Sequence, residues 1–134
     1  MKERELINAA VAAMKKAYSP YSGFCVGAAL LCESGAVYTG CNVENASYGA
    51  SNCAERTAVF KAVSEGERKF AAIAIVGGKG GKITDFCPPC GICRQVLSEF
   101  AGAGFRVLLF DGENAKTLLL SELLPHFFAK NNLE

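Results

Sequence analysis

Hydrophobic residues recur at steps of three and four positions in three segments of the chain, which is the spacing of an amphipathic helix. These segments are Lys2–Tyr18, Cys53–Ser64 and, approximately, Cys90–Phe100. A shorter helical segment, Ser121–Leu124, lies directly before Pro125, which cannot continue a helix. The pattern therefore predicts three main helices and a short fourth one.

Apolar runs rich in β-branched and aromatic residues lie between these segments and predict strands. The runs are Phe24–Cys32, Ala36–Val43, Phe70–Val76, Arg106–Phe110 and Lys116–Leu120. The first two flank a glycine-bearing turn and predict an antiparallel hairpin. The third, FAAIAIV, is apolar on both faces, as expected for a strand covered by helices on either side.

A hairpin combined with helical crossovers predicts an α/β fold, a three-layer α/β/α sandwich around a mixed sheet of about five strands. The length of 134 residues suits one domain covering 1–134. A thioredoxin-like α/β domain is the alternative. Its CxxC motif would follow an early strand, whereas the CxxC here lies past the middle of the chain.

Composition narrows the class of protein. Hydrophobic residues make up 51% of the chain, which excludes a disordered polymer and suggests buried subunit contacts. The net charge of +1 argues against a nucleic-acid partner. No signal peptide and no run of roughly 20 apolar residues is found, so we expect no membrane association and a cytoplasmic protein. Because disulfides are rare in the cytoplasm, the seven cysteines indicate metal binding or thiol chemistry instead.

The CxxC pair formed by Cys90 and Cys93 lies at the start of the third predicted helix. Residues three apart project from the same side of a helix, and the helix dipole favours thiolate over thiol at this end. Both thiols can therefore bind one tetrahedral metal ion. The spacing alone fits two packed core cysteines equally well.

Cys53 opens the second predicted helix and has the same electrostatic advantage. If the two helix starts face each other, three thiolates bind zinc and leave a fourth position for water, as in catalytic sites. Glu55 can then serve as general acid and base, and Arg56 can offset the −1 charge of zinc with three thiolates. A glutamate favoured by the helix dipole and a solvated surface arginine are the plain alternatives.

Several motifs of the chain resemble those of a known family, the small zinc-dependent cytidine deaminases that act on free nucleosides. The motifs that carry the resemblance are CAE at 53–55 and PCGICRQ at 89–95, with YSPYSGFCVGAALL at 18–31, GCNVENASYG at 40–49, NCAERTAVFKAVSEG at 52–66 and ELLP at 122–125. They occur in the family's order and spacing over nearly the whole chain.

The resemblance implies one Zn²⁺ per subunit, bound by Cys53, Cys90 and Cys93, and proton transfer by Glu55. The implied reaction is the hydrolytic deamination of cytidine and 2′-deoxycytidine to the uridines, with release of ammonia, in pyrimidine salvage. Related alternatives are an aminonucleoside-antibiotic deaminase and, less in keeping with the charge pattern, a polynucleotide-editing deaminase. A non-catalytic zinc-stabilised binding module would need protein in the fourth coordination position.

The resemblance also implies substrate contacts. Asn42 and Glu44 would hydrogen-bond the ribose 3′-hydroxyl, and Phe24 would line the pyrimidine pocket. Ala54 and Ala46 would contribute backbone contacts. Four of these five residues also have a plain structural explanation: loop capping for Asn42 and Glu44, core packing for Phe24, and a tight turn for Ala46.

Family members of this size imply a homotetramer in which neighbouring subunits complete each pocket. Tyr48 and Phe128 match positions that reach into an adjoining subunit's site, with Phe128 stacking on the base; a hydrophobic interface is the milder interpretation of Phe128. Cys87 is the one departure from the family pattern. As a fourth thiolate it would make the site structural, but its position outside the helix makes it a poor ligand candidate. His126, the sole histidine, follows ELLP and suits the surface or an interface.

Overall fold

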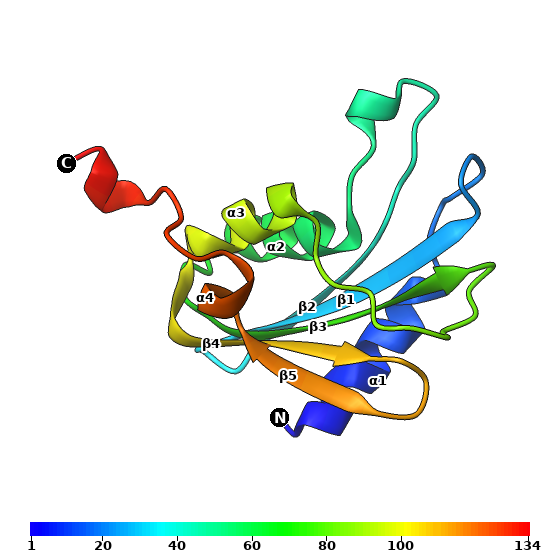
Figure 1. Cartoon of the computed structure of the whole chain (residues 1–134), viewed down its shortest axis with the longest axis horizontal. Coiled ribbons are helices and arrows are strands. Elements are labelled where there is room, and N and C mark those ends of the chain that lie inside the picture. The colour runs from blue at the N-terminus through cyan, green and yellow to red at the C-terminus, as the bar shows by residue number, and fades with distance from the viewer.

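A five-stranded mixed sheet divides the chain into three layers (Figure 1). The computed structural model describes all 134 residues. Its elements are α1 (Glu3–Met14), β1 (Phe24–Cys32), β2 (Val37–Cys41), η1 (Tyr48–Ala50), α2 (Ala54–Ser64), β3 (Phe70–Lys79), α3 (Gly91–Ser98), β4 (Ala101–Phe110), β5 (Ala115–Leu119), α4 (Leu120–Leu123) and η2 (Lys130–Asn132). No helix among them has the length and apolar character needed to cross a membrane.

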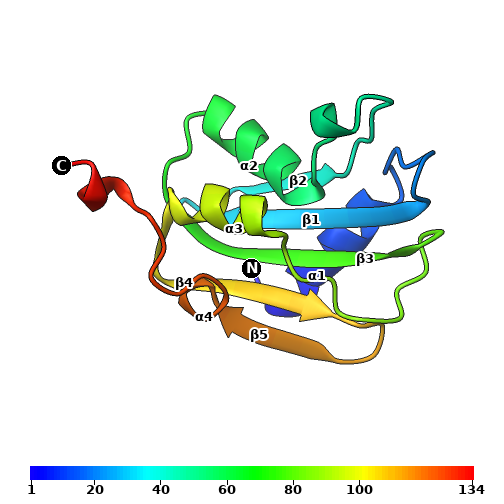
Figure 2. The ribbon, with the colours of Figure 1, turned by 45° about the horizontal axis from the view of Figure 1, so that its top comes forward.

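The strand order is β2-β1-β3-β4-β5, with β3 and β4 parallel and every other pair antiparallel. Helix α1 covers one face of the sheet, and α2 and α3 lie on the other (Figures 1 and 2). Each face has its own hydrophobic core, because alternate residues of a strand point to opposite faces: Leu30 packs under α2 and Ala29 packs under α1. The predicted α/β/α sandwich and its hairpin are confirmed.

Most element boundaries differ from the predicted ones by two residues or fewer, but three differ by more. Helix α1 ends at Met14 rather than Tyr18, because Tyr18 forms a β-bridge with Val43 instead. Strand β3 continues past Val76 to Lys79, and β4 begins at Ala101 rather than Arg106. In β3 and β4 the structure thus turns residues predicted as loop into strand, because pairing with a neighbouring strand outweighs local preference.

Glycines in the sheet allow the helices to pack closely onto it. A Cβ atom on Gly40 in β2 would lie 2.5 Å from the carbonyl oxygen of Ala54 and 2.6 Å from the backbone nitrogen of Ala58, both in α2. A Cβ on Gly27 in β1 would lie 2.1 Å from the carbonyl oxygen of Ala10 in α1. These contacts set how near each helix lies to the sheet, and the Gly40 contact fixes the first turns of α2.

Replacing Gly40 with alanine is expected to lower the free energy of unfolding by about 1–3 kcal/mol, because the helix backbone at this contact cannot move aside cheaply. Gly102→Ala is the matched control, since a Cβ there meets nothing within 4 Å. Urea unfolding followed by circular dichroism measures both. Equal stability of the two variants would contradict the close contact.

Candidate active site

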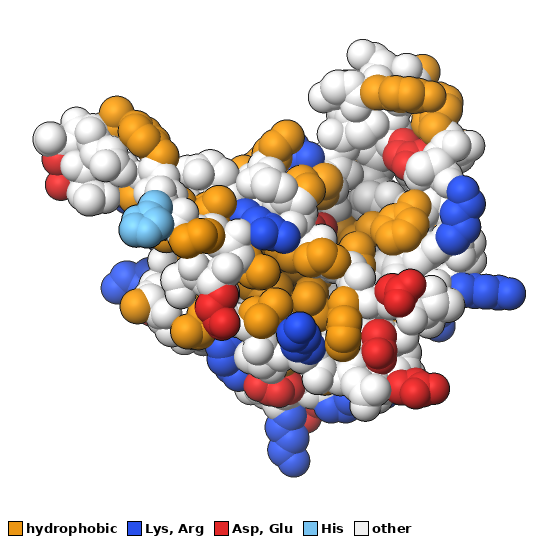
Figure 3. Space-filling view, in the orientation of Figure 1, with side chains coloured by type: hydrophobic (Ala, Val, Ile, Leu, Met, Phe, Trp, Pro, Cys, Tyr) orange, Lys and Arg blue, Asp and Glu red, His pale blue; other side chains and the backbone are white.

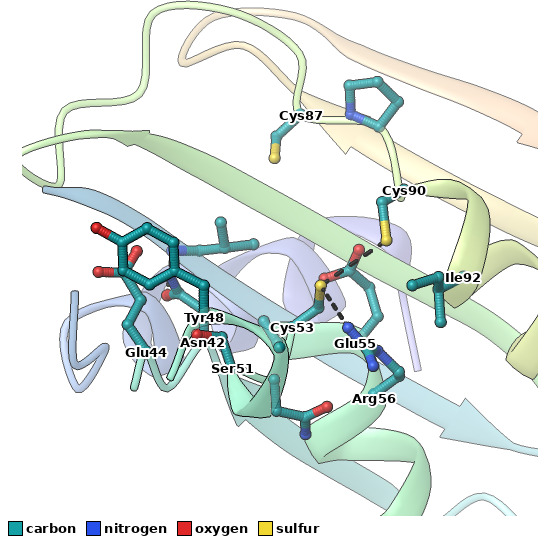
Figure 4. A pocket seen from close by; sticks show the side chains of 15 residues that line it. Asn42, Glu44, Tyr48, Ser51, Cys53, Glu55, Arg56, Cys87, Cys90 and Ile92 are labelled. Atoms are coloured by element: carbon teal, nitrogen blue, oxygen red, sulfur yellow. Dashed lines mark hydrogen bonds between the residues drawn. The ribbon is translucent and has the colours of Figure 1, made fainter. Parts of the chain in front are cut away.

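The starts of α2 and α3 bring three thiols together on one face of the sheet. Cys53 is the N-cap residue of α2, Cys90 is the N-cap residue of α3, and Cys93 lies in the first turn of α3. The three Sγ atoms all lie within 4.8 Å of one another, and those of Cys53 and Cys90 are 3.8 Å apart (Figure 4). The facing helix starts predicted from the sequence are therefore present.

These thiols fit a zinc ion. A tetrahedral ion with zinc–sulfur bonds of about 2.3 Å separates its sulfur ligands by about 3.8 Å. The Cys93 thiol and the Arg56 guanidinium hold the pKa of Cys53 down at about 5, so this group is a thiolate at neutral pH. None of the cysteines forms a disulfide. The fourth position of such an ion is not taken by a fourth thiol, because Cys87 lies outside the cluster.

Glu55 lies in the first turn of α2, and its carboxyl group points toward the thiols (Figure 4). It is only 4% exposed and is the single buried charged residue of the chain. One carboxyl oxygen, Oε1, has no hydrogen-bond partner, which is costly for a buried polar atom and typical of a group kept free for chemistry. Burial raises its pKa to about 7, so it can take up and release a proton near neutral pH.

Arg56 supplies positive charge to the cluster. Its Nη2 atom donates a hydrogen bond to the Cys53 Sγ atom over 3.2 Å (Figure 4). Zinc with three thiolates carries a net charge of −1, and a guanidinium at this distance offsets it together with the two helix dipoles. The geometry favours the charge-offsetting role over that of a solvated surface arginine.

A cavity of about 440 Å³ opens beside the cluster. Its walls come from strand β1, the 42–52 loop, the start of α2 and the segment before α3; the lining residues are Val26, Asn42, Glu44, Tyr48, Gly49, Ser51, Asn52, Cys53, Ala54, Glu55, Arg56, Cys87, Pro88, Cys90 and Ile92. Figure 3 shows this face hollowed beneath the projecting 42–52 loop. A second cavity of about 250 Å³ shares Glu44, Tyr48 and Ser51 with the first.

The polar residues Asn42 and Glu44 both bind the main chain near the start of β1. The Asn42 amide accepts a hydrogen bond from the Val26 nitrogen and donates one to the Phe24 oxygen, each over 2.8 Å. The Glu44 carboxylate accepts hydrogen bonds from the backbone nitrogens of Tyr21 and Ser22 and from the Ser22 hydroxyl. The Ser22 donors lower the pKa of Glu44, which is therefore a carboxylate at neutral pH.

Three residues singled out for substrate contact lie outside the cavity lining. Phe24, the first residue of β1, is 40% exposed, and its ring packs over Gly77 near Cys87. Ala46 is exposed on the 42–52 loop. Phe128 lies in the C-terminal segment, with 59% of its surface exposed. Within one chain, the structure does not bring these three residues to the cluster.

Other lining residues were not singled out as contacts from the sequence. Val26 lies two positions after Phe24 on the same strand, so strand periodicity pointed to it. Cys87 and Pro88 come from the segment that leads into α3, and Cys87 points into the cavity (Figure 4). Burial raises the pKa of the Cys87 thiol to about 11, so it remains protonated. The remaining wall residues, Gly49, Ser51, Asn52 and Ile92, carry no signal that marks them in the sequence.

Comparison with known proteins agrees with this geometry. Residues 1–108 match the family model described as the cytidine and deoxycytidylate deaminase zinc-binding region. The cytidine deaminase of Sporosarcina psychrophila is 47% identical over 99% of this chain and 96% of its own length, and that of Halalkalibacterium halodurans is 47% identical over 99% and 98%.

A crystal structure of cytidine deaminase from Burkholderia pseudomallei covers 96% of this chain and 100% of its own, with 48% identity and a TM-score of 0.87. The likeness thus extends over nearly the whole chain. Full-length identity of this size, together with the matching zinc-binding region, places the chain in the zinc-dependent cytidine deaminase family.

Proposed function

We propose that this protein catalyses the hydrolytic deamination of cytidine and 2′-deoxycytidine, with water replacing the 4-amino group and ammonia leaving. The observation that carries the proposal is the buried Glu55 carboxyl, with one unpartnered oxygen, beside three clustered thiols at the edge of a cavity. Cysteine thiols with a nearby non-ligand carboxyl suit this reaction, since one group moves protons while the others bind the metal.

Cys53, Cys90 and Cys93 would bind zinc, which supplies the Lewis acidity that makes water a nucleophile near neutral pH. Glu55 takes the proton from the attacking water and delivers it to N3 of the base. As the water oxygen bonds to C4, Glu55 carries that oxygen's second proton to the 4-amino group, and the C4–N bond breaks to release ammonia and leave a carbonyl at C4. Arg56 holds the Cys53 sulfur by its hydrogen bond and offsets the negative charge of the thiolates.

The cavity suits an uncharged nucleoside. Its charged lining residues are Glu44, Glu55, Arg56 and the Cys53 thiolate, and the Nη2 atom of Arg56 is already bonded to Cys53. Glu44 is held as a carboxylate, which repels an anion and accepts hydrogen bonds from hydroxyl groups. A ribose or deoxyribose therefore fits the outer part of the cavity better than a sugar phosphate does.

In this proposal Asn42 and Glu44 bind the 3′-hydroxyl, because both already lie in the wall with oxygen atoms that can accept further hydrogen bonds. Ala54 offers its backbone N–H to the base from the first position of α2. Phe24 and Ala46, which lie outside the cavity lining of a single chain, would contribute a side-chain wall for the base and a backbone contact once substrate is bound.

We propose a homotetramer in the cytoplasm, acting in pyrimidine salvage, with pockets completed by neighbouring subunits. Two exposed aromatic residues support the shared pockets. Tyr48 lines the cavity of its own chain but is still 75% exposed at the tip of the 42–52 loop, and Phe128 is 59% exposed in the C-terminal segment. Large exposed aromatic side chains of this kind are typical of contact surfaces.

Replacing Glu55 with glutamine is expected to lower kcat by about 10²–10⁴-fold, because the amide keeps the shape of the side chain but cannot carry a proton. Glu65→Gln, at the exposed end of the same helix, is the control and should leave kcat unchanged. Turnover is followed by the loss of cytidine absorbance, and zinc content by atomic absorption. Glu55→Gln with near-normal turnover and bound zinc would refute the assigned role.

Replacing Cys90 with serine is expected to abolish stoichiometric zinc binding, because one of the three clustered sulfurs is lost. Cys87→Ser is the matched variant three positions earlier, and it should retain one zinc per chain. Both are measured by metal analysis of the purified proteins. Loss of zinc from the Cys87 variant would instead support a four-thiolate structural site.

Deoxycytidine 5′-monophosphate is expected to react with a kcat/KM about 10²-fold or more below that of deoxycytidine, since its phosphate would lie near the Glu44 carboxylate without a free cation. Parallel assays of the two compounds on the same preparation measure the ratio. Similar kcat/KM values would show that the proposed nucleoside preference is wrong.

A further inference from the structure

The C-terminal segment, residues 124–134, leaves the body of the molecule after α4 and projects from its end (Figure 1). Pro125 and His126 turn the chain here, and His126 is the one residue other than glycine with a positive φ, 53°. Such a backbone conformation is costly for a side-chain-bearing residue, so the surrounding contacts must hold the chain in this path.

Two adjacent phenylalanines of this segment have opposite surroundings. Phe127 is half-buried and lines a groove with Ser98 and Glu99 at the end of α3, whereas Phe128 is 59% exposed. The next residue, Ala129, has an extended backbone with φ −133° and ψ 173°. Successive side chains of an extended chain point to opposite sides, so fixing the main chain here fixes the direction of Phe128.

Two consecutive residues of α3 make that attachment. Arg94 donates hydrogen bonds to the carbonyl oxygens of Pro89 and Leu123, each over 2.7 Å, and so ties α3 to the point where the C-terminal segment begins. Gln95 donates from Nε2 to the carbonyl oxygen of Phe128 over 2.8 Å. The hydrogen bond from Gln95 thus acts on the very residue whose ring is exposed.

The ion pair that also joins the segment to the end of α3 is weaker than this hydrogen bond. Lys130 Nζ lies 3.6 Å from Glu99 Oε2, and these side chains are 74% and 47% exposed. An exposed ion pair at this distance contributes little, because water and salt screen it. The Gln95 hydrogen bond is therefore the specific tether of Phe128 to the helix that carries Cys90 and Cys93.

We infer that Gln95 is a positioning residue for Phe128: it holds the main chain so that the aromatic ring faces away from its own subunit. This inference rests on the proposed function, in which Phe128 reaches a neighbouring subunit's pocket and stacks on the base. Helix α3 then serves two active sites. Its first turn supplies thiols to one pocket, and its middle directs the ring that serves another.

The test uses tryptophan at position 128, because the chain contains no tryptophan and the new ring reports its own mobility. In a Phe128→Trp protein, adding Gln95→Ala is expected to lower the fluorescence anisotropy of the ring. It should also raise KM for cytidine about fivefold, the effect of losing one hydrogen bond, with kcat within about twofold. Zinc content should stay the same. Lys130→Ala in the same background is the control and should change none of these values.

Equal anisotropy with and without Gln95 would overturn the inference, whatever the kinetics. A fall in anisotropy with an unchanged KM would show that Phe128 does not contact substrate, which would refute that element of the proposed function. The role of Gln95 in substrate binding would then also be refuted, although Gln95 would still order the ring. A fall in kcat at constant KM would also overturn it, because a ring that only stacks on the base binds the ground state and the transition state alike.

Discussion

The crowding of three thiols and a carboxyl group at two helix starts is the constraint on which the rest of the structure depends. Three thiols, one of them held as a thiolate, lie within 4.8 Å of one another beside a buried carboxyl group. Such a cluster is stable in its ionised form only if nearby positive charge compensates it. The two helix N-termini, the Arg56 guanidinium and a divalent cation supply that charge together, and each needs α2 and α3 to begin at the same edge of the sheet.

The sheet meets this requirement by backbone contact rather than by side chains. Gly40 lets the first turns of α2 lie directly on β2, so the positions of Cys53 and Glu55 follow from the strand. The wall of the cavity is tied to the same strands, since the Asn42 amide bonds to the main chain of β1 on both sides. Side chains at the site are therefore held by the regular part of the fold even where they lie on loops.

Sequence reasoning found the parts of the site that local structure determines. Hydrophobic periodicity placed Cys53, Cys90 and Glu55 at the starts of two helices, where the structure has them, and the family resemblance joined them into one site. It did not find the main-chain partners of Asn42 and Glu44, because these bonds join segments about 20 residues apart whose approach depends on the folded loop. The early start of β4 was missed for a similar reason: its glycines look like a helix end, yet the strand pairs with β3.

Glu44 and Glu55 show how surroundings give one chemical group two different properties. Glu44 is half-buried and receives three hydrogen bonds from the 21–22 segment, which lower its pKa and keep it a fixed acceptor. Glu55 is buried with an unpartnered oxygen, which raises its pKa toward neutrality and frees it to move protons. Exchanging the two environments would remove both properties. Glu55 with three hydrogen-bond donors would stay ionised and could not take up a proton near neutral pH, and Glu44 without donors in a buried site would be partly protonated and a weaker acceptor for hydroxyl groups. The division of labour between them is therefore a property of the fold rather than of the residue type.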